Sequence, residues 1–130
     1  MILLDTHVVI WLAQDYERIS PKAQAAIDEA RQKERGVAVS DITLFEIALL
    51  ASHGRVAFRP DVETTLSEVG RQFVVLPITA NIALQAYELP RGYPNDPVDR
   101  IVGATALIED IPLVTADAQI HKSRAVRTIW

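Results

Sequence analysis

The sequence predicts an α/β protein in which helices cover both faces of a parallel sheet. Three observations lead to this prediction. Short apolar segments alternate with longer amphipathic ones, 49% of the 130 residues are hydrophobic, and only 23% are charged. Strands that alternate with helices are joined by right-handed crossovers, which place helices on both sides of the sheet. The length is that of one ordinary domain, so we expect a single domain over residues 1–130.

Four apolar segments and one terminal segment are the predicted strands. Ile2-Leu3-Leu4 is wholly apolar and ends at Asp5, which is typical of a central strand buried on both faces. Further strands are predicted at 37–39, 73–76 and 113–114, with a short edge strand within 126–130.

Helices are predicted between these strands from capping residues and helical spacing of apolar residues. Thr6 is the expected cap of a first, short helix, and Ser20 followed by Pro21 begins a second one that Gly36 ends. The other predicted helices run from Ser40 or Asp41 to Gly54, from about 62 to Gly70, over 79–89 and over 97–109. The segment 90–97 contains three prolines and one glycine, so we expect it to interrupt the helices.

The composition excludes several classes of protein. There is no cysteine, so neither a disulfide framework nor a thiolate metal site is expected. No apolar run reaches the roughly 18 residues of a membrane span, and no signal peptide is visible, so we expect a cytoplasmic protein without membrane contact. A net charge of −4 argues against a protein that coats nucleic acid by bulk attraction.

Four acidic residues are expected to meet near one edge of the sheet. Asp5 ends the first strand, Asp117 follows the strand at 113–114, and Asp99 lies in the first turn of the helix over 97–109. Glu46 interrupts an apolar run about two turns into its helix, where a buried acid is costly unless it is paired or bound to metal. Ligands of open α/β sheets bind at the carboxyl ends of the strands, where three of these acids are placed and which the fourth can reach from a neighbouring helix.

Each acid also has a purely structural interpretation. Asp5 and Asp117 can cap the helices that follow them, and Glu46 can face solvent. Asp96 fits the N-cap before Pro97, which leaves Asp99 as an acid that the helix dipole favours in the first turn. However, two carboxylates about 4 Å apart repel by about 4 kcal/mol at an effective dielectric of 20, so a cluster of them requires a cation or protonation. Oxygen ligands favour Mg²⁺ or Mn²⁺, and hydrolysis of phosphate esters is the chemistry that uses such a site.

Four segments, in this order along the chain, resemble PIN-domain ribonucleases, and closely the VapC toxins of bacterial type II toxin–antitoxin systems. The segments are Leu-Leu-Asp-Thr-His at 3–7 with Trp11, Ser-Asp-Ile-Thr-Leu-Phe-Glu-Ile at 40–47, Asp-Pro-Val-Asp-Arg at 96–100 followed by Ala-Thr-Ala at 104–106, and Pro-Leu-Val-Thr-Ala-Asp at 112–117. The resemblance implies a three-layer α/β/α fold with a parallel sheet in the order 3-2-1-4-5. It also implies a Mg²⁺- or Mn²⁺-dependent endoribonuclease that cuts structured RNA, often tRNA.

The same resemblance implies roles for individual residues. It assigns catalysis and metal binding to Asp5, Glu46, Asp99 and Asp117. It assigns supporting positions beside the site to Thr6, Ser40, Thr115 and Asp96, of which Asp96 either contacts the metal or only caps a helix. The implied mechanism is in-line attack of a metal-bound water on the phosphate, without a protein nucleophile.

The resemblance also implies partners: a second copy in a homodimer, and a VapB-like antitoxin that blocks the site and binds DNA, so that DNA is contacted only indirectly. RNA phosphates are the predicted contacts of Arg91, Arg100, Lys122, Arg124 and Arg127, which can equally be solvated surface charges. Tyr93 is a candidate contact of RNA or antitoxin. The histidines His7, His53 and His121 lack ligand spacing and are expected to be structural or on the surface.

Two other functions compete with the nuclease. A Mg²⁺-dependent phosphotransfer domain shares the sheet type, but dehalogenase-like phosphatases need a second aspartate where this chain has His7. A non-catalytic RNA-binding inhibitor of translation would not need all four acids. RNA incubated with protein and either Mg²⁺ or EDTA distinguishes the nuclease from such a binding module.

Overall fold

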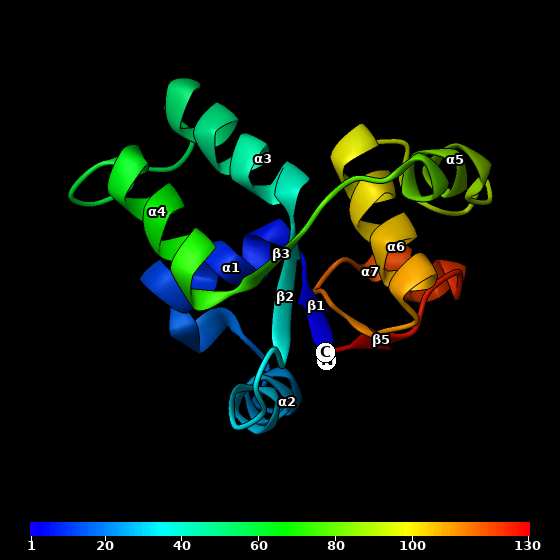
Figure 1. Ribbon diagram of the computed structural model, residues 1–130, viewed down its shortest axis with the longest axis horizontal. Helices are drawn as coiled ribbons and strands as arrows, with labels where there is room; N and C mark the ends of the chain where they lie inside the picture. Colours follow the sequence, from blue (N-terminus) through cyan, green and yellow to red (C-terminus); the bar gives the residue numbers. More distant parts are fainter.

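Five parallel strands form the middle layer of the structure, a computed structural model that describes residues 1–130. The strands are β1 (Ile2–Leu4), β2 (Val37–Ser40), β3 (Val74–Leu76), β4 (Leu113–Val114) and β5 (Thr128–Ile129). Their order is β3-β2-β1-β4-β5, with β1 in the centre between β2 and β4 (Figure 1). The predicted α/β class and the order 3-2-1-4-5 are therefore confirmed.

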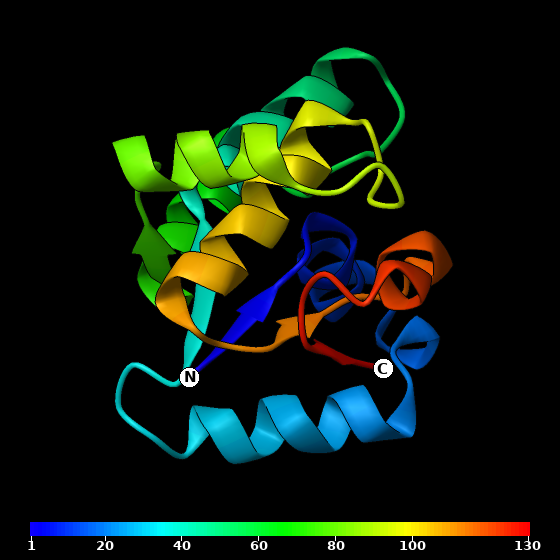
Figure 2. The same ribbon diagram turned by 90° about the vertical axis from the view of Figure 1, so that its right-hand side faces the viewer.

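Helices lie on both sides of this sheet. They are α1 (Thr6–Gln14), α2 (Pro21–Arg31), α3 (Asp41–Ser52), α4 (Val62–Gln72), α5 (Ala80–Glu88), α6 (Pro97–Glu109) and α7 (Ala118–Ser123), with a 3-10 turn at Tyr16–Arg18. In Figure 1, α1 and α4 lie on one side of the strands and α6 and α7 on the other, while Figure 2 shows α2 running below the start of β1. No helix combines the length and apolar character that crossing a membrane requires.

Alternate residues of the strands pack into two separate hydrophobic cores. Leu4 and Val39 belong to the larger core, together with side chains of α1, α2, α3 and α4. Leu3 and Ala38 belong to a second core that contains side chains of α6 and α7. Burial on both faces explains why these two strands are continuous apolar runs and do not alternate with polar residues.

The predicted helix boundaries at Thr6 and Gly70 are wrong. Asp5 is the N-cap of α1, because its side chain accepts a hydrogen bond from the N–H of Thr6, which makes Thr6 the first residue of the helix. The helix predicted to end at Gly70 continues to Gln72. A helical glycine costs only about 1 kcal/mol, and the adjacent Val69 is 5% exposed, so its burial keeps this turn against the core.

The remaining differences lie at the ends of elements. Helix α2 ends at Arg31, several residues before the predicted stop at Gly36. The predicted strands at 73–76 and 126–130 are shortened to β3 and β5. Hydrophobic patterns locate an element better than its terminal residues, which depend on local hydrogen bonds.

Gly103 allows α6 to pack against the ring of Tyr93. A Cβ atom at position 103 would collide with the hydroxyl of Tyr93 and lie 2.5 Å from its Cζ. We expect Gly103→Ala to lower the free energy of unfolding by about 1–3 kcal/mol, because the core around this ring would be overpacked.

Urea denaturation measures this effect, with Gly70→Ala in α4 as the matched control. No atom lies within 4 Å of a Cβ built at Gly70, so this second change should stabilise the helix by about 0.5–1 kcal/mol. Equal stability of Gly103→Ala and the unchanged protein would contradict the packing described here.

Candidate functional site

Asp5 lies at the carboxyl end of β1 and is only 3% exposed. Its Oδ1 accepts a hydrogen bond from the N–H of Thr6 at 2.9 Å, and its Oδ2 accepts one from the hydroxyl of Thr115 at 2.7 Å. That hydroxyl also accepts a bond from the N–H of Asp117 at 3.1 Å. Because Thr115 directly follows β4, these bonds join the ends of two adjacent strands and hold the Asp5 carboxylate in one orientation.

His7 makes a second link between the ends of β1 and β4. Its Nε2 accepts a hydrogen bond from the N–H of Ala116 at 3.0 Å, and its Nδ1 lies 3.4 Å from Oδ2 of Asp5. Since Nε2 is the acceptor, the proton of a neutral ring lies on Nδ1 and faces Asp5. The ring also packs against Trp11, with 4.8 Å between centroids. Sequence reasoning missed this contact, for which the only signal is the position two residues after Asp5.

Asp99 and Glu46 are the two site acids whose pKa values are raised. The pKa of Asp99 is raised to about 7, first by burial and then by the charges of Asp5, Asp96, Glu46 and Asp117. Burial is also the main cause that raises the pKa of Glu46; a threonine hydroxyl acts against it, and Asp5 and Asp96 add to it. Neither acid forms an ion pair with lysine or arginine. The acids therefore lie within electrostatic reach of one another.

Asp96 and Asp117 are N-caps, as their structural interpretation predicted. Asp96 accepts hydrogen bonds from the N–H groups of the second and third residues of α6, at 2.9 and 3.2 Å. Asp117 accepts bonds from the corresponding groups of α7, at 2.8 and 3.2 Å. In both carboxylates these bonds use Oδ1 alone, so capping does not occupy the second oxygen.

The predicted supporting residues connect the elements that carry the acids. Ser40 is fully buried at the end of β2 and caps α3 by accepting a hydrogen bond from the N–H of Ile42 at 3.2 Å. The hydroxyl groups of Thr6 in α1 and Thr43 in α3 lie 3.1 Å apart and share a hydrogen bond. These contacts fix the start of α3, the helix of Glu46, beside the end of β1.

Two residues predicted to contact RNA make their contacts within the protein: Arg100 is half-buried and Tyr93 is fully buried. The guanidinium of Arg100 donates hydrogen bonds to the carbonyls of Ala86, Tyr87, Leu89 and Pro94, so it joins the end of α5 to the following segment. Tyr93 is fully buried, which corrects its prediction as a contact of RNA or antitoxin. Other predicted cations are exposed: Arg91, Lys122, Arg124 and Arg127, the last of which pairs with Asp110.

The carboxylate oxygens at this site fit a hard divalent cation that is bound partly through water. Asp5, Glu46, Asp99 and Asp117 offer only oxygen atoms, and their mutual repulsion favours a positive ion among them. No group of three or more acidic or histidine side chains is close enough to hold one ion directly. Mg²⁺ commonly binds one or two carboxylates and keeps several waters, so this looser arrangement is compatible with it.

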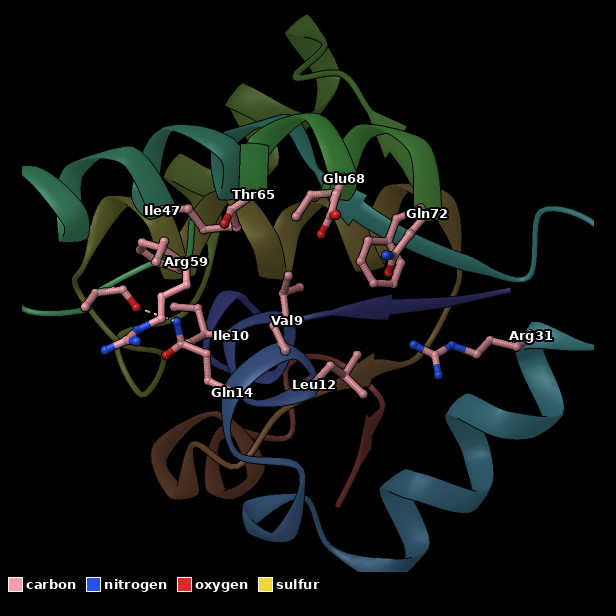
Figure 3. A pocket seen from close by; sticks show the side chains of 15 residues that line it. Val9, Ile10, Leu12, Gln14, Arg31, Ile47, Arg59, Thr65, Glu68 and Gln72 are labelled. Carbon is pink, nitrogen blue, oxygen red and sulfur yellow. Dashed lines mark hydrogen bonds between the residues drawn. The ribbon is translucent and has the colours of Figure 1, made fainter. Parts of the chain in front are cut away.

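A cavity of about 630 Å³ lies apart from this site. Apolar side chains of α1, among them Val9 and Leu12, line it together with the segment 57–59 and mostly polar side chains of α4, such as Glu68 (Figure 3). Arg31 and Arg59 lie at opposite ends of the cavity in this view. None of the four acids lines it.

Known proteins resemble this chain over nearly its full length. The family model of the PIN domain matches residues 2–125. The chain is 34% identical over 131 residues to Ribonuclease VapC22 of Mycobacterium tuberculosis, which covers 99% of this chain and 98% of the relative.

Solved structures share the fold. VapBC2 from Rickettsia felis, bound to a DNA fragment from its promoter, matches with a TM-score of 0.74 and 15% identity, over 98% of this chain and 97% of the other. DNA-bound VapBC from Salmonella typhimurium matches with a TM-score of 0.71 and 18% identity, over the same shares of the two chains. Taken with the match over residues 2–125 and the full-length relative, these findings show that the chain belongs to the PIN domain family and is related to the VapC ribonucleases.

Proposed function

We propose that this protein is a VapC-type toxin that cleaves structured RNA, such as tRNA, as a Mg²⁺- or Mn²⁺-dependent endoribonuclease. The observation that carries this proposal is the group of acids without lysine or arginine partners: Asp5 and Asp117 at the ends of β1 and β4, with Glu46 on α3 and Asp99 on α6. The mutual repulsion of these acids contributes to raising the pKa of Asp99 to about 7. The name of the 34% identical relative supports a ribonuclease activity.

Asp5 and Asp99 would hold the cation, with Glu46 and Asp117 completing or adjusting its surroundings. When bound there, a divalent cation would supply the positive charge that polarises phosphoryl oxygens, lowers the pKa of a water and stabilises the leaving oxygen. The protein contributes the fixed orientation of Asp5, which follows from its bonds to Thr6 and Thr115. No side chain serves as a nucleophile.

Substrate and partners follow from the same assignment. The exposed side chains Arg91, Lys122 and Arg124 can contact RNA phosphates, which would position the substrate without reading its sequence. The solved VapBC structures support a VapB-like antitoxin as partner, through which DNA is bound indirectly. A homodimer is compatible with exposed apolar side chains on α3 and α5. Phe45 of α3 is 58% exposed, and Tyr87 of α5 is 84% exposed.

Incubation of structured RNA with the purified protein tests the proposed activity. We expect discrete internal cuts with Mg²⁺ or Mn²⁺, no cuts with EDTA, and recovery when excess Mg²⁺ is added back, because the acids cannot replace the cation's positive charge. Mapping the RNA ends by primer extension records the result. RNA binding without any cation-dependent product would instead favour the non-catalytic inhibitor of translation.

A further inference from the structure

Tyr93 is a buried residue beside the site, and the proposed reaction assigns no step to it. Its ring belongs to the second core, together with Val102 and Ala106 of α6. Its hydroxyl donates a hydrogen bond to the backbone carbonyl of Asp99 at 3.0 Å. Burial and then the charges of Asp5, Asp99 and Asp117 raise the pKa of the phenol. The neutral hydroxyl therefore lies within electrostatic reach of three of the site carboxylates.

The partner of this hydroxyl distinguishes Tyr93 from an ordinary core tyrosine. Any buried tyrosine needs a hydrogen-bond partner for its hydroxyl, and many carbonyls can serve. Here the acceptor is the carbonyl of Asp99 itself, in the first turn of α6. In an α-helix the same carbonyl also accepts the N–H four residues later, which belongs to Gly103. Gly103 is also the residue whose missing side chain makes room for the phenol.

The segment 92–94, which contains Tyr93, is hydrogen-bonded to the first turns of α6 and α7, the helices of Asp99 and Asp117. The carbonyl of Gly92 accepts a hydrogen bond from the side chain of Gln119, in the first turn of α7, at 3.4 Å. The carbonyl of Pro94 accepts one from Arg100 of α6 at 3.3 Å. Together with the hydrogen bond from the hydroxyl of Tyr93 to the carbonyl of Asp99, three hydrogen bonds hold this segment between the starts of α6 and α7.

We propose that Tyr93 is a positioning residue, whose hydroxyl fixes the first turn of α6 so that the Asp99 carboxylate keeps the separation from Asp5 that a divalent cation needs. The part of this inference that concerns cation binding rests on the proposed function. The part that concerns the backbone of the first turn of α6 does not. A role in core packing alone would change the stability and leave cation binding as it was.

Tyr93→Phe tests this inference, because it removes the hydroxyl and keeps the ring against Gly103. We expect the affinity for Mn²⁺ alone, measured by titration calorimetry without RNA, to fall about tenfold, as is typical when a residue that orients a ligand is lost. The kcat of RNA cleavage at fixed low Mn²⁺ should fall by a similar factor while KM for RNA changes little. Amide hydrogen exchange should accelerate in residues 99–103 and remain unchanged in α2.

Val126→Ala is the matched control, since Val126 is buried in the same core but far from Asp99 in the sequence and without a hydrogen bond to it. It should lower the urea midpoint without weakening Mn²⁺ binding. Equal Mn²⁺ affinity in Tyr93→Phe and the unchanged protein, or an equal loss in both variants, would overturn the positioning role. If the unchanged protein bound no Mn²⁺, the proposed function would fail, and the exchange of residues 99–103 would still decide whether Tyr93 holds this turn.

Discussion

Asp5→Asn is expected to lower the rate of RNA cleavage by at least about 100-fold while leaving the fold intact. Residues that only orient metal ligands already contribute 10- to 100-fold, and Asp5 is proposed as a ligand itself. Asparagine keeps an oxygen for the N–H of Thr6, so the cap of α1 survives. The hydroxyl of Thr115 can turn to accept from the new amide, so a hydrogen bond between the ends of β1 and β4 remains.

Cleavage of a structured RNA under single-turnover conditions measures this loss, and circular dichroism checks the fold. Asp61→Asn is the matched control, because Asp61 also caps a helix, α4, but is fully exposed and takes no part in the proposed site. It should cleave like the unchanged protein. Activity of Asp5→Asn within a few-fold of the control would remove Asp5 from the proposed mechanism.

Cleavage at low Mg²⁺ is expected to fall about tenfold for each pH unit below 7. The pKa of Asp99 is raised to about 7 by burial and neighbouring carboxylates, so its protonated fraction grows below this pH, and a protonated carboxyl is a poor cation ligand. Saturating Mg²⁺ should move the midpoint of the pH–rate profile to lower pH, because the ion favours the charged form of Asp99. A rate profile from pH 5.5 to 8.5 at two Mg²⁺ concentrations measures both effects. A flat profile at low Mg²⁺ would contradict the role of Asp99.

The stability of the cation-free protein should change in the opposite sense. Because the pKa of Asp99 is higher in the folded state than its usual value of 3.8, the folded protein holds a proton that the unfolded chain releases. The free energy of unfolding therefore decreases as the pH rises from about 4 to 7, and the loss is complete above pH 7. Asp99→Asn removes this repulsion. Because solvent screens part of the repulsion, we expect Asp99→Asn to be more stable than the unchanged protein by about 1–2 kcal/mol at pH 8 in EDTA.

Urea denaturation at pH 4 and pH 8 measures this difference, which should vanish at the lower pH. Mg²⁺ should stabilise the unchanged protein at pH 8 but not Asp99→Asn, which also loses cleavage. A variant that gains stability and loses activity would separate the role of Asp99 in catalysis from any role in the fold. Equal stabilities at pH 8 would show that repulsion among the acids is weak.

Predictions from the sequence were most accurate where the cause is local. Asp96 and Pro97 begin α6 at the expected residue because an N-cap followed by proline fixes the first turn without help from the rest of the chain. The apolar run before Asp5 forms the central strand because only burial on both faces suits it. Gly70 misled the prediction of α4, since the core packing of Val69 outweighs the small helical cost of glycine.

The sequence by itself located the strands and most of the helices to within several residues, because hydrophobic periodicity and capping act locally. It also placed Asp5 and Asp117 where their strands end. Only the tertiary structure decided that His7 bridges Asp5 and Ala116, that Arg100 binds the end of α5, and that Tyr93 is buried against α6. These contacts depend on the distances between segments, which the strand order and helix packing set together. The raised pKa of Asp99 has the same origin, because three of the four carboxylates that repel it stand on other elements.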